Sequence, residues 1–268
     1  MELNNRLDFL LKFISSNANK ALEHFNNGNN DNHSKNDGSL VTELDVFLNK
    51  KFISEISIKY PGEGVLGEEI SLKKNSNFQW VIDPIDGTDA FVMGSANWTI
   101  SVGLLDDGAP VLGVVANPIL NRILFAFKGG GAFKTKITNY QKCDQIFISD
   151  TRSISDAKIF GLYDKNALYA PSAFIKDIIK DAKYYLDFYS FSEHCSYLAM
   201  GKADAVIFWW DTLYDIAPLK IIIEEAGGKV TDLFGEDQRY DCPIKGAILS
   251  NGHLHGFLVE KLNSELHK

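Results

Sequence analysis

Three carboxylates lie close together in the segment WVIDPIDGTDAF, residues 80–91: Asp83, Asp86 and Asp89. The segment begins as an apolar strand, so these like charges leave a buried element where little water can separate them. Pro84 fixes one backbone angle and Gly87 permits a tight turn, so the carboxylates are directed rather than loose. Oxygen ligands without His or Cys are preferred by hard cations, Mg²⁺ above all. The segment therefore predicts a Mg²⁺ site, with backbone N–H groups beside it for an anion.

Other acidic residues could join this site, but each has an ordinary structural interpretation: Asp45, Glu68, Glu69 and Asp215. Asp45 follows Thr42 by three positions, which is the spacing of a helix capping box. Asp215 could cap the helix that follows it. Glu68 and Glu69 could be ordinary turn residues. Taken alone, each of these acids favours the structural interpretation.

Two competing motifs fit the sequence poorly. An EF-hand loop needs acids at alternating positions, whereas Asp83 and Asp86 are three apart. The stretch GEGVLG, residues 62–67, matches the glycine pattern of a dinucleotide-binding turn. It follows a predicted helix and precedes two glutamates, where a pyrophosphate would need positive potential. Neither motif is favoured.

Nucleophilic catalysis by cysteine or serine is also disfavoured. His194 and Cys195 are adjacent, so their side chains diverge on a helix or a strand. The three widely spaced cysteines form no disulfide framework and no zinc signature. They indicate structural thiols in a reducing cytoplasm. No Gly-x-Ser-x-Gly elbow occurs.

Composition limits the partners that the chain could bind. The chain has 268 residues, of which 45% are hydrophobic, and a net charge of −8 without a basic block. Nucleic acid is therefore an unlikely partner, whereas a metal cation suits the charge. We expect no secretory signal at the start, and no apolar run has the roughly 20 residues of a membrane span.

Periodicity predicts the elements that must position the acids. Apolar residues at helical spacing predict helices over 7–25, 42–60 and 172–182, and a last helix beginning at about Asp215 and ending at 227–228. The polar stretch 26–39 predicts a mobile surface loop. Between residues 79 and 129, β-rich runs with turn residues predict a hairpin-rich sheet covered by the first two helices. The pattern restarts near residue 140, so we predict an N-terminal α+β half over 1–140 and a C-terminal α/β half over 141–268.

Several motifs together resemble the inositol monophosphatase family of Mg²⁺-dependent phosphatases. They occur in the family's order along most of the chain: KNDGSLVTELD at 35–45, GEE at 67–69, WVIDPIDGTDAF at 80–91, KGGGAF at 128–133 and YDIAPLKIIIEEAGG at 214–228. The resemblance implies an α/β fold of alternating α-β-α-β-α layers, a homodimer, and two or three Mg²⁺ ions. It also implies sensitivity to lithium.

The resemblance assigns roles to individual residues. The implied metal ligands are Glu68, Asp83, the carbonyl oxygen of Ile85, Asp86 and Asp215. Thr88 and Glu68 would hold the attacking water, and Asp45 would orient the water of a further metal. The N–H groups of Gly87 and Thr88 would contact the phosphate, beside Asp86. Catalytic roles therefore fall on Glu68, Thr88 and Asp45.

The implied reaction is hydrolysis of a small-molecule phosphate monoester resembling inositol 1-phosphate or histidinol phosphate. Inositol-cleaving members carry a Gly-x-Ala and a Glu, where this chain has YSF (189–191) and Phe208. Phe208 cannot accept a hydrogen bond from a ring hydroxyl, although Asp211 could replace that Glu. Asp89 is then a substrate-side or solvent-facing residue. The alternatives are a nucleotide or sugar bisphosphate phosphatase of the 3′-phosphoadenosine type and a non-catalytic metal- or phosphate-binding regulator.

Overall fold

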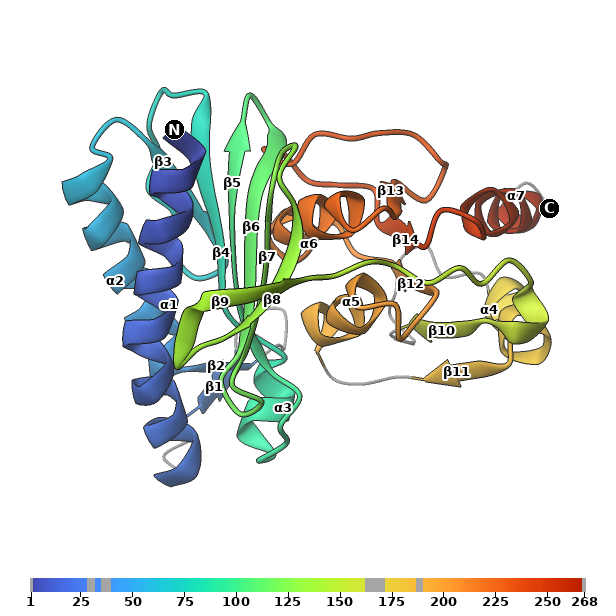
Figure 1. Cartoon of the computed structure of the whole chain (residues 1–268), viewed down its shortest axis with the longest axis horizontal. Coiled ribbons are helices and arrows are strands. Elements are labelled where there is room, and N and C mark those ends of the chain that lie inside the picture. Colours follow the sequence, from blue (N-terminus) through green and yellow to red (C-terminus); the bar gives the residue numbers. More distant parts are fainter. Residues whose placement is uncertain (1, 28–31, 35–39, 162–171, 187–189, 267–268) are drawn as a thin grey trace.

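The structure is a computed structural model that describes residues 2–27, 32–34, 40–161, 172–186 and 190–266. It contains two main β-sheets separated and flanked by helices (Figure 1). None of the described helices has both the length and the apolar character needed to cross a membrane.

The first sheet has seven strands in the order β3-β4-β5-β6-β7-β8-β9. Their bounds are β3 (Gly64–Gly67), β4 (Phe78–Asp86), β5 (Thr99–Asp106), β6 (Ala109–Asn117), β7 (Arg122–Phe127), β8 (Gly131–Lys136) and β9 (Asn139–Gln145). β3 is parallel to β4, and every later pair is antiparallel. This is the hairpin-rich sheet that the alternating pattern predicts.

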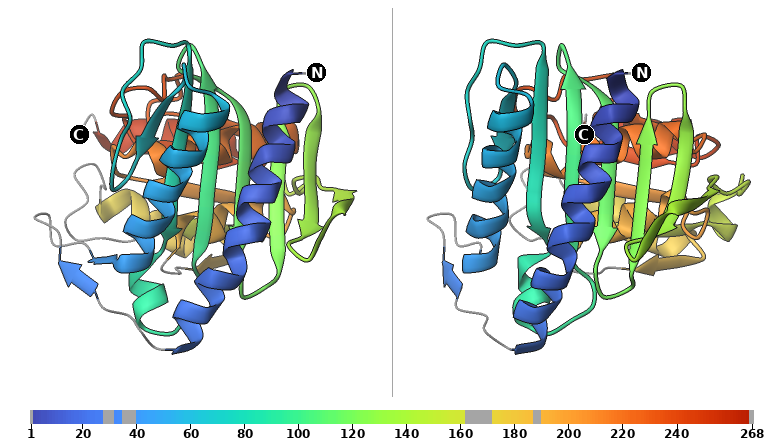
Figure 2. Two further views of the ribbon diagram at one scale, coloured as in Figure 1. Left: turned by 90° about the vertical axis from the view of Figure 1, so that its left-hand side faces the viewer. Right: turned by 60° about the vertical axis from the view of Figure 1, so that its left-hand side comes forward.

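Two long helices cover one face of this sheet, as predicted: α1 (Glu2–Asn27) and α2 (Glu43–Lys59). They lie side by side across the strands (Figure 2). Their apolar faces bury Phe13 and Phe52 against Trp80 of β4 in one hydrophobic core. Thr42 caps α2, and its capping box with Asp45 is complete, as their spacing predicts.

The second sheet has five strands in the order β11-β10-β12-β14-β13. Their bounds are β10 (Lys158–Gly161), β11 (Tyr184–Leu186), β12 (Ala205–Phe208), β13 (Lys229–Thr231) and β14 (Ala247–Ser250). Helices α5 (Phe191–Ala199) and α6 (Leu213–Glu225) lie between the two sheets, and α4 (Ser172–Asp181) and α7 (His255–Leu266) lie beyond the second (Figure 1). The predicted α-β-α-β-α layering is confirmed.

Three hydrophobic clusters fill the contacts between these layers. The first joins α1 and α2 to the first sheet, the second joins both sheets to α5 and α6, and the third joins the second sheet to α4 and α7. Close approach of α6 requires small residues on the sheet, because a Cβ at Gly113 would lie 2.1 Å from the carbonyl oxygen of Pro218. The contact between α6 and the first sheet is therefore tightly packed. The predicted division at residue 140 stays a prediction.

Several local predictions were wrong. The polar stretch 26–39 is not entirely loop, because β1 (Asn32–Ser34) pairs with β2 (Leu40–Thr42); residues 28–31 and 35–39 lie outside the described residues. α6 begins at Leu213, two positions before Asp215, because Thr212 is its N-cap. It is not the last helix, since α7 follows it. The short helix α3 (Thr88–Val92) follows directly after β4.

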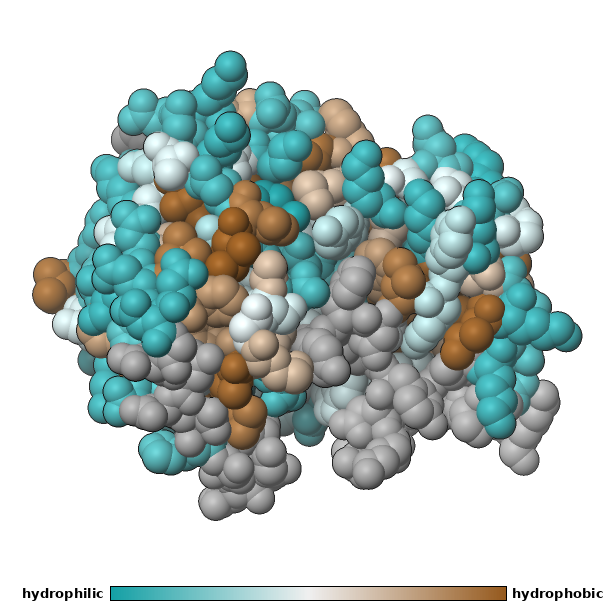
Figure 3. Space-filling model, turned by 90° about the horizontal axis from the view of Figure 1, so that it is seen from below, coloured by the Kyte–Doolittle hydropathy of each residue, from teal (hydrophilic) through white to brown (hydrophobic). Residues whose placement is uncertain are grey.

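The surface seen from below is hydrophilic around much of its edge, and hydrophobic residues gather left of the centre of the view (Figure 3). Individual large apolar side chains are exposed, among them Ile58 and Met93. Isolated exposed apolar residues are normal on folded proteins.

Candidate active site

A β-bulge at the end of β4 places Asp83 and Asp86 on one side of the sheet. Asp83 lies opposite Ser101 and Asp86 lies opposite Thr99, so β4 spans three positions where β5 spans two. In a regular strand, residues three apart point to opposite faces; the extra residue removes this mismatch. Both carboxylates therefore leave the strand toward the same region.

The turn after the bulge is held by its own side chains. The Ile85 N–H donates to Oδ1 of Asp83 at 3.0 Å, and the Thr88 hydroxyl donates to the Ile85 carbonyl oxygen at 3.0 Å. Gly87 is the N-cap of α3 and has a φ of 85°, a conformation that glycine adopts without strain. The turn therefore needs the glycine that the sequence supplies.

Asp215 reaches the same place from the other half of the chain. It lies in the first turn of α6, where the hydroxyl of Thr212 donates to its Oδ2. One carboxylate oxygen each from Asp83, Asp86 and Asp215 lies within 4.8 Å of the others. The structure thus brings together three of the predicted metal ligands, and we call them the acidic cluster.

Glu68 also lies beside the acidic cluster. It directly follows β3, and its N–H donates to the Ile82 carbonyl oxygen at 3.1 Å, so the parallel pairing of β3 and β4 holds it near Asp83. Its charge is among the causes that raise the pKa of Asp83, Asp86 and Asp215. Four acids from three separate segments therefore share one electrostatic environment.

Burial and mutual repulsion shift the pKa of these acids upward. Burial is the largest cause at Asp83, followed by the charges of Glu68, Asp86 and Asp215. Burial also raises the pKa of Asp215 well above its usual value. At Asp86 burial raises the pKa to about 6, against hydrogen bonds from Ser190 and Ser192 that favour the charged form. The cluster thus resists ionisation without an added positive charge.

Asp45 lies at the edge of this environment. It is fully buried, and burial raises its pKa to about 7, with smaller contributions from the charges of Glu68 and Glu69. Its Oδ2 accepts hydrogen bonds from Thr42, whereas its Oδ1 is buried without a hydrogen-bond partner among the described residues. Asp45 is therefore both the N3 residue of the α2 capping box and a residue with one oxygen available to a ligand.

The substrate-side predictions fare differently. Asp89 and Asp211 are exposed, and no hydrogen bond or ion pair in the described part of the chain joins either side chain to the acidic cluster. Phe208 is 2% exposed and packs against Phe191, with ring centroids 4.5 Å apart. Of the YSF segment, Tyr189 lies outside the described residues, while Ser190 and Phe191 are buried. The three cysteines are free, as predicted.

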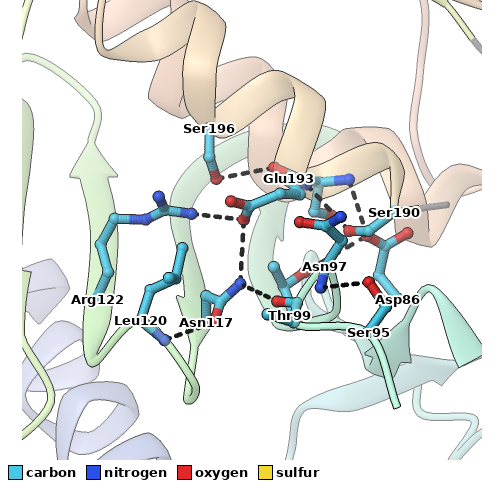
Figure 4. Close-up of polar contacts among 12 residues, drawn as sticks. Asp86, Ser95, Asn97, Thr99, Asn117, Leu120, Arg122, Ser190, Glu193 and Ser196 are labelled. Carbon is cyan, nitrogen blue, oxygen red and sulfur yellow. Dashed lines mark hydrogen bonds and ion pairs between the residues drawn. The ribbon is translucent and has the colours of Figure 1, made fainter. Parts of the chain in front are cut away.

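The sequence analysis missed the donors that surround Asp86. Its Oδ2 accepts hydrogen bonds from the Ser190 hydroxyl, from the Ser192 N–H at 2.8 Å and from the Thr99 hydroxyl at 3.4 Å (Figure 4). Ser190 is the N-cap of α5. The pattern Ser-Phe-Ser-Glu at 190–193 has capping-box spacing and could have indicated this helix start.

The donor set of the acidic cluster fits a hard divalent cation. All its side-chain ligands are carboxylate oxygens, they converge within 4.8 Å, and they are buried or partly buried. Such a cluster is costly without a counter-charge and becomes favourable when a cation binds. The groups therefore suit Mg²⁺ better than a soft metal.

Sequence and structure comparisons give a consistent family relationship. The sequence matches the inositol monophosphatase family over residues 6–267. It is 32% identical over 263 residues to the fructose-1,6-bisphosphatase/inositol-1-monophosphatase of Thermotoga maritima, covering 97% of this chain and 96% of that protein. It is 30% identical to the histidinol-phosphatase of Mycobacterium tuberculosis, covering 86% and 87%. The fold superposes on the solved Thermotoga maritima IMPase with a TM-score of 0.85 and 32% identity, covering 98% of both chains.

Proposed function

This chain belongs to the inositol monophosphatase family, and from that premise we propose that it is a metal-dependent hydrolase of a small-molecule phosphate monoester. The observation that carries the proposal is the convergence of Asp83, Asp86 and Asp215 within 4.8 Å. Three carboxylates this close would repel an anionic substrate, so they require a cation to bind one. The proposed cofactor is Mg²⁺, with two or three ions per site.

The proposed ligands are Glu68, Asp83, the Ile85 carbonyl, Asp86 and Asp215. When bound, Mg²⁺ supplies charge neutralisation of the phosphate oxygens and lowers the pKa of water. The chain itself holds the reactants. The β4 bulge aims Asp83 and Asp86 together, and the first N–H groups of α3 have no intrahelical partner, which suits them to a phosphate oxygen.

Thr88 and Glu68 are the proposed holders of the attacking water. The Thr88 hydroxyl donates to the Ile85 carbonyl oxygen, so its oxygen keeps lone pairs that can accept a hydrogen bond from water. Glu68, on the neighbouring strand end, can accept a second hydrogen bond from that water and take up the one proton that the water loses when it attacks. The family resemblance implies that Asp45 orients a further water, and its Oδ1, which has no hydrogen-bond partner among the described residues, could accept from that water.

The substrate is proposed to resemble inositol 1-phosphate or histidinol phosphate. Phe208 stands where inositol-cleaving members carry a Glu and cannot accept a hydrogen bond from a ring hydroxyl, which disfavours a polyol. The similarity to a histidinol-phosphatase supports this preference. Because a relative is named fructose-1,6-bisphosphatase, a sugar bisphosphate is a second candidate class.

A substrate panel tests the proposal directly. Purified protein with Mg²⁺ should release phosphate from at least one of inositol 1-phosphate, histidinol phosphate, fructose 1,6-bisphosphate and 3′-phosphoadenosine nucleotides. Asp83→Asn should abolish turnover while circular dichroism stays unchanged. Absence of turnover on the whole panel, with metal still bound, would favour a non-catalytic metal- or phosphate-binding regulator instead.

Lithium sensitivity and a homodimer are further proposals from the family. Li⁺ should inhibit in competition with Mg²⁺, so its half-inhibitory concentration should depend on the Mg²⁺ concentration. Light scattering of the purified protein measures the oligomeric state and would show whether a dimer forms.

A further inference from the structure

A buried ion pair lies behind Asp86 and joins the two halves of the chain. Arg122, the first residue of β7, contacts Oε2 of Glu193 on α5 at 2.5 Å. The Glu193 side chain is fully buried, and that of Arg122 is 12% exposed. The side-chain amide of Asn117, at the end of β6, donates to the same oxygen at 3.3 Å. Figure 4 shows this network running from Arg122 to Asp86.

Glu193 occupies a position that usually serves a different purpose. It is the third residue after the N-cap Ser190, where a glutamate commonly bonds back to the backbone of the cap. Its backbone N–H does donate to the Ser190 hydroxyl at 3.1 Å, but its carboxylate turns toward Arg122 and Asn117 instead. The side chain therefore fastens the start of α5 to the first sheet.

The start of α5 supplies two hydrogen-bond donors to Asp86. Within three residues, the Ser190 hydroxyl and the Ser192 N–H both donate to Oδ2 of Asp86. Ser190 accepts from the Glu193 N–H while it donates to Asp86, so one hydroxyl links the two carboxylate-bearing residues. A shift of Glu193 would thus move two donors to Asp86, Ser190 and Ser192, while Thr99 on β5 would stay in place.

Stability alone gives a weak reason for a charge at this position. Burying an ion pair costs desolvation that its attraction often does not recover, and apolar replacements can be equally stable. The Oε1 atom of Glu193 is buried without a hydrogen-bond partner among the described residues, which adds to that cost. What the pair does provide is a fixed orientation of α5 relative to β6 and β7.

We propose that Glu193, through its ion pair with Arg122, is a positioning residue that holds Asp86 in its ligand geometry by fixing the start of α5. The proposal rests on the proposed function in one respect, that Asp86 is a metal ligand. Residues behind metal ligands commonly change metal affinity about 10- to 100-fold when substituted. Glu193 acts on the metal through Ser190, Ser192 and Asp86, with no direct contact.

The test is a Mn²⁺ titration of the full chain followed by electron paramagnetic resonance, without substrate. Glu193→Gln should weaken Mn²⁺ binding about tenfold or more relative to wild type. The matched control is Glu63→Gln, which also removes a buried carboxylate paired with an arginine. That arginine is Arg6 of α1, and the pair lies away from the acidic cluster. Both variants should lose stability in urea, but Glu63→Gln should bind Mn²⁺ as wild type does.

A double-mutant cycle distinguishes a specific effect on the position of Asp86 from a general loss of stability. If Glu193 acts through Ser190, Glu193→Gln in a Ser190→Ala background should weaken Mn²⁺ binding by less than it does in wild type. If Glu193→Gln fails to fold, Arg122→Lys serves in its place and should weaken binding severalfold. Wild-type Mn²⁺ affinity in Glu193→Gln, or in Arg122→Lys where that variant is used instead, would overturn the proposal. An equal loss of Mn²⁺ affinity in Glu63→Gln would also overturn it. Because the readout needs no substrate, failure of the phosphatase panel would leave this result interpretable.

Discussion

The hydroxyl of Thr88 donates a hydrogen bond to the carbonyl oxygen of Ile85 at 3.0 Å, and this bond joins two atoms to which the family resemblance gives separate roles. A carbonyl oxygen has two lone pairs, so this bond leaves one for a cation. The N–H of Ile85 is fixed by Asp83 in turn. The proposed metal ligand and the proposed water holder are therefore placed by the same few hydrogen bonds.

Replacing Thr88 with valine should reduce kcat about 100-fold, because the proposed water then lacks one partner and is misplaced. Metal affinity should change little, since the lost hydroxyl only contacts one ligand. Thr88→Ser keeps the hydroxyl and is the control, with kcat expected within severalfold of wild type. Steady-state kinetics on the best panel substrate, with Mn²⁺ affinity measured alongside, checks both; a valine variant with full kcat would remove Thr88 from the mechanism.

Gly87→Ala should destabilise the protein by more than the ordinary cost of a left-handed residue. Its φ of 85° costs an alanine about 1–2 kcal/mol. In addition, the new Cβ would lie 2.9 Å from both the Cβ of Ser190 and the carbonyl oxygen of Asn97. Gly94→Ala is the matched control, because Gly94 has a φ of 76° and open space around a new Cβ. Urea unfolding should rank Gly87→Ala well below Gly94→Ala; equal losses would contradict the predicted clash.

Glu225 connects the glycine-rich turn of the KGGGAF segment to the end of α6. Its two carboxylate oxygens accept from the Gly129 N–H at 2.6 Å and from the Gly131 N–H at 2.7 Å. Hydrogen bonds to a charged group contribute about 1.5–3 kcal/mol each at most, and partial exposure reduces this, so Glu225→Ala should cost about 1–2 kcal/mol. Glu224→Ala, which removes an exposed acid that pairs with Lys220, should cost about 0.5 kcal/mol or less. The free energy of unfolding measures both, and turnover should be unchanged in each.

Local patterns in the sequence predict the first sheet, the two helices that cover it and the acids Asp83 and Asp86, whereas the five alternating layers and the other proposed metal ligands were implied by the family resemblance. Alternation along the strands and the carboxylates around Pro84 are visible in consecutive residues. Asp215 was predictable through the resemblance, whereas its contact with Asp83 and Asp86 depends on how α6 packs between the sheets. Long-range packing of this kind cannot be inferred from the residues of a single segment.

The hydrogen-bond partners of Asp86 could not be predicted from the sequence. Ser190 lies 104 positions away from Asp86, and Glu193 lies 71 positions from Arg122. The capping pattern at 190–193 could have indicated a helix start, but not what that helix contacts. Asp89 seemed part of one cluster with Asp83 and Asp86, yet it is exposed and lies in α3, which begins between Asp86 and Asp89. The partners of buried polar groups are decided by tertiary contacts.

The stability of the metal-free protein should fall as pH rises, whereas the additional stabilisation by Mg²⁺ should increase. Burial raises the pKa of Asp86 to about 6 and that of Asp45 to about 7, from a usual value of 3.8. At a pH between the usual pKa of 3.8 and the raised folded-state pKa, each of these carboxyl groups binds more protons in the folded state than in the unfolded state. Its stabilising protonation is complete below about pH 4 and is lost as pH rises through 6 to 7.

Metal-free protein in chelator should therefore lose unfolding free energy between about pH 4.5 and pH 7.5, measured by urea titration at each pH. Asp86→Asn cannot ionise at that position, so its decline should be shallower than that of wild type. Saturating Mg²⁺ should stabilise more at pH 7.5 than at pH 5, because the cation competes with protons for the same carboxylates. A decline of equal steepness in Asp86→Asn, or Mg²⁺ stabilisation that is independent of pH, would show that these acids are not the groups that couple folding to the metal.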